Sequence, residues 1–123
     1  MNIEELYQFC ISKPGVTEDF PFDKNTLVFK VCGKMFALCG LERWENGDKS
    51  INLKCDPQWA IELRTTYTAI LPGYHMSKKH WNTVLLDTQE ISPSFLKELI
   101  DHSYAMVVKG LPKKVQQQLE QDF

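Results

Sequence analysis

Three β-rich runs follow one another in the first half of the chain, and they restrict the possible folds more than any other feature. Residues 27–32 and 34–39 flank Gly33, and residues 50–55 come shortly after the turn signal Asn46-Gly47. A glycine between two β-rich runs predicts a tight hairpin. In residues 50–55 apolar and polar side chains alternate, as expected of a strand with one face in water. The three runs therefore predict an antiparallel meander.

Helical patterns surround these strands. Apolar side chains at helical spacing predict an amphipathic helix over residues 2–12, with Asn2 as its cap. Asp56-Pro57 opens a second helix. Ser92-Pro93 starts the longest helix, which Gly110 ends. The remaining predicted elements are two strands at residues 68–71 and 82–86 and a short terminal helix from residue 111 onwards.

The order of these elements predicts the fold class. It is helix, three strands, helix, two strands, helix and helix, with residues 16–23 as an irregular acidic connection. Helices gathered on one face of an antiparallel sheet fit this order. We therefore expect a single α+β domain over residues 1–123, with an antiparallel sheet of about five strands and helices packed on one of its faces. A chain of 123 residues can bury roughly two-thirds of its unfolded surface.

Residues 72–84 carry the strongest functional signal. This segment contains two His, two Lys, a Tyr, a Trp and an Asn, and no acidic residue occurs between Glu62 and Asp87. In a chain whose formal net charge is −2, this is a local reversal of sign. Such a segment suits a phosphate, an acidic ligand or an acidic partner surface. It can equally be an ordinary loop whose aromatic side chains are buried.

The residue types of this segment are those that nucleic-acid surfaces use. Lys78 and Lys79 can contact phosphates, and the two histidines can donate hydrogen bonds to them. Asn82 can reach a phosphate or a base edge. Tyr74 and Trp81 can stack on unpaired bases. The segment therefore predicts a nucleic-acid contact, with a solvated loop on buried aromatic anchors as the alternative.

The run Gly73-Tyr74-His75 followed by Lys78-Lys79-His80-Trp81-Asn82 resembles the MmcQ/YjbR family of small bacterial proteins. The matches span roughly residues 20 to 115. Three shorter pieces match in the family's order: Gly33-Lys34-Met35-Phe36-Ala37, Leu53-Lys54-Cys55-Asp56-Pro57, and Ser103-Tyr104 followed by Val107-Val108. The resemblance implies a frataxin-like (CyaY-like) two-layer α/β fold. It also implies the DNA-binding role proposed for the family.

The family's proposed double-wing arrangement puts Lys34 on one hairpin tip and Lys78 with Lys79 on the other. The candidate nucleic-acid-binding residues are then Lys34, His75, Lys78, Lys79, His80 and Asn82. The chain has a pI near 5.9, whereas strong non-specific binders show a clear basic excess. We therefore expect weak, electrostatic DNA binding by a monomer, with a Kd of ~10⁻⁴ to 10⁻⁶ M or poorer.

Other functions stay open. The same loop can be a small-anion or protein-partner site. Catalysis would need Cys55 and Asp56 to meet His75 or His80, and no Gly-rich phosphate loop, G-x-S-x-G elbow or H-E-x-x-H pair is present. Zinc motifs need closer, repeated spacing than the histidines offer. We therefore expect no enzymatic activity, no catalytic residue, no metal site and no cofactor.

The cysteines and the apolar pattern predict a compartment. Cys10, Cys32, Cys39 and Cys55 lack C-x-x-C spacing, and the acidic start of the chain is unlike a signal peptide. No apolar run approaches the ~20 residues needed to cross a bilayer. The sequence therefore predicts a cytoplasmic protein with free thiols and no membrane segment.

Overall fold

A computed structural model describes residues 1–121. These residues form six strands and five helices. The strands are β1 (Val16–Asp19), β2 (Thr26–Val31), β3 (Lys34–Gly40), β4 (Ser50–Lys54), β5 (Ile70–Pro72) and β6 (Trp81–Leu85). The helices are α1 (Ile3–Ile11), α2 (Leu41–Glu45), α3 (Pro57–Thr66), α4 (Pro93–Lys109) and α5 (Lys113–Gln121).

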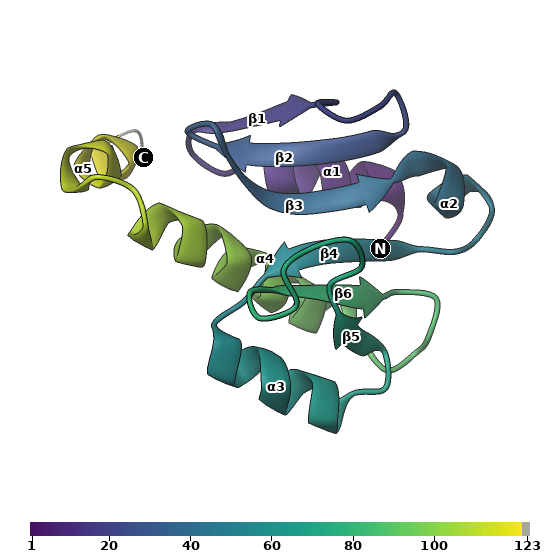
Figure 1. Cartoon of the computed structure of the whole chain (residues 1–123). Coiled ribbons are helices and arrows are strands. Elements are labelled where there is room, and N and C mark those ends of the chain that lie inside the picture. Colours follow the sequence, from purple (N-terminus) through teal and green to yellow (C-terminus); the bar gives the residue numbers. More distant parts are fainter. Residues whose placement is uncertain (122–123) are drawn as a thin grey trace.

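The strands make one antiparallel sheet in the order β1-β2-β3-β4-β6-β5 (Figure 1). The predicted meander is confirmed as β2, β3 and β4. The turn between β2 and β3 has positive φ at Cys32 (50°) and at Gly33 (83°), while Val31 pairs with Lys34. Positive φ at both central residues is the mark of the type I′ hairpin, whose twist matches that of the flanking strands.

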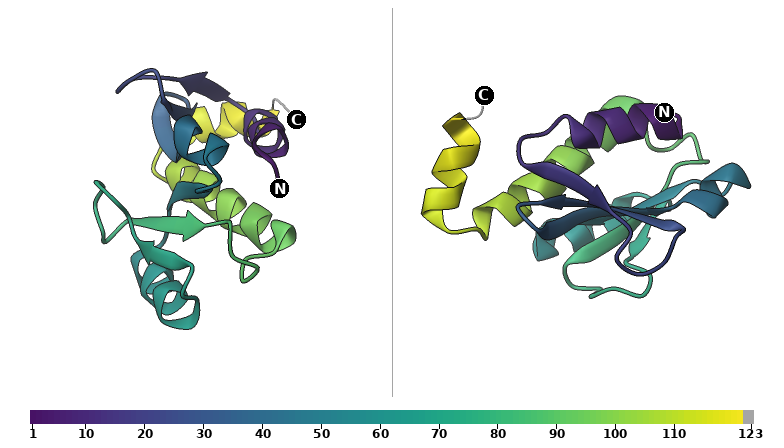
Figure 2. Two further views of the ribbon diagram at one scale, coloured as in Figure 1. Left: turned by 90° about the vertical axis from the view of Figure 1, so that its right-hand side faces the viewer. Right: turned by 90° about the horizontal axis from the view of Figure 1, so that it is seen from above.

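The molecule has two layers, which confirms the predicted α+β class. Helices α1 and α4 lie behind the sheet, and α3 runs along its β5 side (Figures 1 and 2). All three helices bury side chains in one core, where Leu6, Leu63 and Ile100 meet Phe29 and Phe36 of the sheet. Helix α5 extends beyond the end of α4 and buries Leu119.

The other face of the sheet, which we call the open face, carries no helix layer (Figure 2). A second apolar cluster lies here, built from Val28, Leu38 and Trp81 with Met35 and Met76 packed against it. The connection from β5 to β6, residues 73–80, lies in front of this face (Figure 1). The segment with the strongest functional signal in the sequence is therefore on the side that the helices leave uncovered.

The sequence prediction missed two elements. Residues 16–19 of the predicted irregular connection are the edge strand β1, so the sheet has six strands rather than five. Only Val16 of this strand is partly buried, so the strand lacks the apolar alternation that marks a half-buried strand. Helix α2 has five residues and is too short to show helical periodicity.

A serine of α4 joins two strands where they separate. Strands β3 and β4 pair through Ala37 with Leu53 and through Leu38 with Asn52. Beyond these pairs, the buried Ser103 hydroxyl donates to the Phe36 carbonyl at 2.5 Å and accepts from the Lys54 N–H at 2.8 Å. The end of β4 is thereby fixed to the helix layer. Among residues 1–121 no helix is both long enough and apolar enough to cross a bilayer.

Candidate functional site

Residues 73–80 are held tightly at their start. The Gly73 N–H donates to the Trp81 carbonyl at 2.8 Å, and the Tyr74 N–H donates to the Thr83 hydroxyl at 3.1 Å. A Cβ atom on Gly73 would lie 2.8 Å from Trp81 Cβ and 2.9 Å from the Trp81 carbonyl oxygen. Only glycine allows the backbone to approach this closely. The segment therefore leaves β5 in a fixed direction.

Arg64 of α3 holds the other end of the segment. Its guanidinium donates to the carbonyl oxygens of Lys78 and Trp81, the latter at 3.2 Å. Its Nε donates to Asn82 Oδ1 at 2.7 Å. A planar guanidinium with several donors suits this fan of acceptors. The turn that carries the two adjacent lysines is thus fastened to a helix on the far side of β6.

Strand register brings the two predicted wings to the same end of the sheet. Lys34 begins β3, Lys54 ends β4 and pairs with Trp81 at the start of β6, and the Cys55 N–H donates to the His80 carbonyl at 2.8 Å. Two strand spacings would put the backbones of Lys34 and His80 roughly 10 Å apart, and the separation of β3 from β4 beyond Ala37 and Leu53 makes this distance larger. We call the group of basic residues at this end the basic end of the sheet: Lys34, Lys54, Lys78, Lys79 and His80.

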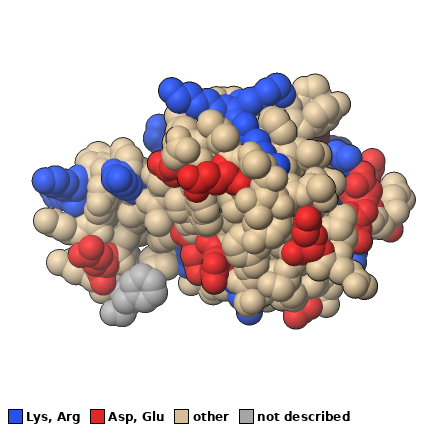
Figure 3. Space-filling view, turned by 90° about the horizontal axis from the view of Figure 1, so that it is seen from below, with Lys and Arg blue, Asp and Glu red and all other residues tan. Residues whose placement is uncertain are grey.

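The lysines of the basic end have no carboxylate partner among residues 1–121, where three ion pairs occur elsewhere. One of these pairs lies close by: Lys30 Nζ is 3.0 Å from an Asp19 oxygen, and this hydrogen bond lowers the pKa of Asp19 below its usual range. Lys34, Lys78 and Lys79 are exposed. In Figure 3, Lys and Arg gather along the top, the side of the molecule that carries the open face.

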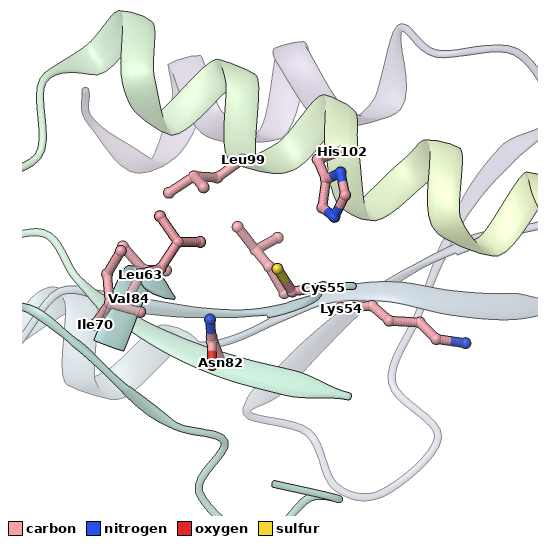
Figure 4. Close-up of a pocket in the computed structure, with 9 residues that line it drawn as sticks. Lys54, Cys55, Leu63, Ile70, Asn82, Val84, Leu99 and His102 are labelled. Carbon is pink, nitrogen blue, oxygen red and sulfur yellow. The ribbon is translucent and has the colours of Figure 1, made fainter. Parts of the chain in front are cut away.

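Asn82 is a correction to the predicted set. Its side chain is 2% exposed, and it points from β6 toward α4 rather than toward the open face (Figure 4). Its Oδ1 accepts from Arg64, and its Nδ2 has no hydrogen-bond partner within residues 1–121. A buried amide cannot reach a phosphate or a base edge. Asn82 therefore positions Arg64 instead of contacting a ligand.

The two aromatic candidates have different surroundings. Trp81 is 8% exposed and packs with Val28 and Leu38, so it is an anchor of the open-face cluster. Tyr74 is 61% exposed, and its ring centroid is 4.0 Å from that of His75. His75 itself is exposed with a positive φ of 58°. Of the two predicted stacking residues, Tyr74 alone therefore remains available to a base.

A groove with a volume of about 430 Å³ lies on the open face beside this segment. Its walls include Phe22 from the connection before β2 and Tyr74 with His75 from residues 73–80, and its lining also includes Asn52 and Thr83. The volume falls in the range of small-molecule sites. His75 thus lines the groove, whereas the other exposed candidates lie at the basic end.

Comparison with known proteins identifies the family. Residues 11–106 match the YjbR family model. The chain belongs to the YjbR family. It is 40% identical to YbdF of Escherichia coli O157:H7 over 94% of this chain and 92% of that protein. It is 34% identical to YjbR of Escherichia coli K12 over 98% of this chain and 99% of that protein.

The solved structure of protein DR2400 from Deinococcus radiodurans has the same fold. It superposes with a TM-score of 0.83 at 36% identity, over 97% of this chain and 88% of the other. These names state no ligand and no reaction. The comparisons therefore establish the YjbR family and its fold.

Burial favours the protonated form of three thiols in this YjbR-family chain. Burial raises the pKa of Cys10, Cys39 and Cys55 to about 12. Cys32 is exposed at the β2–β3 turn. The described cysteines are all free. Within residues 1–121, no three His, Cys, Asp or Glu side chains converge to hold a metal ion.

Two residues that the sequence did not single out complete this YjbR-family site. Lys54 joins the basic end because of its pairing with Trp81, and Arg64 fixes the turn that carries Lys78. The alternation of residues 50–55 predicts that Lys54 lies on the solvent-facing side of its strand, so the sequence does indicate its exposure. The role of Arg64 depends on how α3 packs, and no local pattern reveals it.

Proposed function

We propose that this YjbR-family chain is a non-enzymatic nucleic-acid-binding protein that holds phosphates at the basic end of its sheet. The observation that carries the proposal is the meeting of Lys34, Lys54, Lys78 and Lys79 at one end, without carboxylate partners in the described chain. These amines project from backbone positions spread over more than roughly 10 Å, because β3 and β4 separate at this end. One small anion cannot contact all of them, whereas a polyanion with regularly spaced charges can.

The proposed binding is weak and electrostatic. Each phosphate that a lysine neutralises releases counterions, so affinity falls as the salt concentration rises. The net charge of −2 opposes long-range attraction of DNA, so we expect weak binding, with a Kd of ~10⁻⁴ to 10⁻⁶ M or poorer at physiological salt. A monomer in the cytoplasm is the proposed state, because reducing conditions there suit four free cysteines.

Charge reversal at the turn tests the proposal. Labelled DNA, as a duplex and as a single strand, is titrated at several salt concentrations with the parent and with Lys78→Glu/Lys79→Glu. We expect the double variant to bind at least about tenfold more weakly at low salt. We also expect the slope of log K against log salt to become shallower by about 1 for each phosphate that the variant no longer neutralises.

The matched control is Lys49→Glu/Lys97→Glu. It changes the net charge equally, but Lys49 precedes the opposite end of β4 and Lys97 lies on α4 in the helix layer. The control should keep the parent's slope. The proposal fails if the parent does not bind DNA at low salt, or if both double variants lose the same affinity.

A further inference from the structure

We infer that the groove on the open face is a stacking site for an unpaired base, so that the nucleic acid held at the basic end is single-stranded. The inference rests on the proposed function and specifies its ligand. It is carried by the groove's two exposed aromatic side chains, by the polar side chains of Asn52 and Thr83 in its lining, and by its position next to the basic end.

Two aromatic rings are exposed on separate connections that border the groove. Phe22 is 63% exposed and Tyr74 is 61% exposed, and both line the same space. Large apolar side chains in contact with water are costly to retain, and when they border a common hollow they mark a binding site. Phe20, two residues before Phe22, is 42% exposed and does not line the groove. The groove therefore has aromatic walls that the protein core does not use.

The backbone beneath each ring is fixed before any ligand arrives. The Asp23 carboxylate accepts from the N–H groups of Asn25 at 2.8 Å and Thr26 at 2.7 Å, which closes the turn after Phe22. The bond from Tyr74 to the Thr83 hydroxyl fixes the opposite wall. Rings on ordered backbone lose little conformational freedom on binding, which favours stacking on a flat ligand.

The lining of the groove also carries polar side chains from β4 and β6, beside the apolar Leu38 and Met76. Asn52 Oδ1 accepts from the Thr83 hydroxyl at 2.5 Å, and the Asn52 amide nitrogen has no hydrogen-bond partner within residues 1–121. An amide NH₂ group donates to the carbonyl and ring-nitrogen acceptors on base edges. Stacking needs a free base face and edge readout needs a free pairing edge, and only an unpaired base offers both. Two aromatic side chains together with the Asn52 amide therefore fit a base outside a duplex.

The groove and the basic end form one surface. Asn52 and Lys54 lie two residues apart on β4 and share its open face, which puts them ~7 Å apart along the strand. A nucleic-acid strand whose phosphates meet the basic end can therefore place a neighbouring base in the groove. Proteins that bind single strands combine a cationic track with aromatic side chains in this way.

The test compares strands that carry the same phosphates with and without bases. A short oligothymidylate, an abasic phosphodiester of equal length and a duplex are titrated at low salt. We expect the parent to bind the oligothymidylate at least about fivefold more tightly than the abasic strand, because stacking one base on an aromatic ring is worth at least that factor. The duplex should bind more weakly than the oligothymidylate.

Substitutions in the groove walls locate the preference. Phe22→Ala and Tyr74→Ala should each lower the affinity for oligothymidylate toward that for the abasic strand, while the abasic affinity stays at the parent's value. Phe20→Ala is the control, since Phe20 is exposed on the same connection outside the groove. It should keep the full preference. All three side chains are exposed, so these variants should retain the parent's fold.

The outcomes separate the two proposals. If the abasic strand binds and Lys78→Glu/Lys79→Glu weakens it, while oligothymidylate shows no advantage, the basic end stands and the groove inference is wrong. The inference is also wrong if the preference survives in Phe22→Ala and Tyr74→Ala, or if the duplex binds as tightly as the single strand. If the parent binds none of the three probes, the proposed function falls as well.

Discussion

At the scale of single residues, the partly buried His102 links helix α4 to the start of helix α3. It projects from α4, and its Nε2 accepts from the Asp56 N–H at 3.1 Å, at the cap of α3. Its ring lies edge-on to Trp59 with centroids 4.5 Å apart. Burial lowers the pKa of His102 below its usual 6.5, and the nearby Asp56 carboxylate opposes this shift only in part. The neutral ring is therefore the form that the fold requires.

This gives a pH dependence of known sign. The folded pKa lies below the unfolded one, so the unfolded chain binds the proton more readily, and stability falls as the pH drops from ~6.5 through the folded pKa. We expect the urea midpoint to decrease from pH ~7 to ~5. Gln in place of His102 keeps an acceptor and does not titrate, so His102→Gln should remove this decrease.

The two aspartates with lowered pKa values do not contribute to the change in stability between pH ~7 and ~5. Hydrogen bonds from backbone N–H groups lower the pKa of Asp23, and a hydrogen bond from Lys30 lowers that of Asp19, so their contributions are lost only below pH ~4. If His102→Gln shows the same decrease between pH ~7 and ~5 as the parent, His102 is not its source.

Asn82 shows why residue type alone misplaces a side chain. In the run Trp81-Asn82-Thr83-Val84, side chains alternate between faces, so Asn82 shares a face with Val84 and Trp81 shares one with Thr83. Each face therefore holds one apolar and one polar residue, and the alternation does not show which face is buried. The packing of α4 and of residues 73–80 decides it. Lys34, Lys78 and Lys79 were placed correctly at the surface because lysine is seldom buried.

At the scale of elements, the contact between α3 and the turn before β6 determines where the lysines stand. Arg64 supplies donors to Lys78, Trp81 and Asn82, and the Asn82 amide has no other partner among residues 1–121. A substitution that removes the guanidinium leaves Asn82 Oδ1, which is partly buried, without its donor. It also takes one donor from the Lys78 carbonyl and one from the Trp81 carbonyl, which keeps the Gly73 N–H. Each buried polar group that loses its hydrogen-bond partner lowers the stability of the folded protein.

We expect Arg64→Ala to lower the free energy of unfolding by about 2–4 kcal/mol in urea denaturation. Thr65→Ala is the control on the next residue, because the Thr65 hydroxyl bonds only the Ile61 carbonyl of its own helix within residues 1–121. It should change stability by less than about 0.5 kcal/mol. Equal stability of the two variants would show that the Arg64 contacts do not hold the turn.

The elements that the sequence predicted are those with strong local signals. Asn2 caps α1 through the Glu5 N–H at 2.8 Å, and the hairpin at Gly33 has the backbone that its glycine indicated. Strand β1 and helix α2 form for non-local reasons. Strand β1 pairs along β2, and α2 packs the buried Trp44, whose Nε1 donates to the Ser50 carbonyl. Pattern alone does not reveal such elements.

At the scale of the whole molecule, the distribution of charge matters more than its sum. The chain carries 14 Lys and Arg against 16 Asp and Glu, which gives no indication of a basic surface. Ion pairs neutralise Lys13, Lys30 and Arg43. At one end of the sheet lie four lysines that have no carboxylate partner among the described residues: Lys34, Lys54, Lys78 and Lys79. Register depends on the whole sheet, so the sequence predicted Lys34, Lys78 and Lys79 as candidates, but not that Lys54 joins them.

The most direct test of this account is an amide-resolved NMR titration of the parent with oligothymidylate at low salt. The account predicts that the shifting amides lie at residues 32–34, at Lys54 and across residues 73–80, with Phe22 included if a base enters the groove. The NMR signals of the amides in α1 and α4 should not shift. Shifts concentrated in those two helices, or no shifts at all, would contradict binding at the basic end.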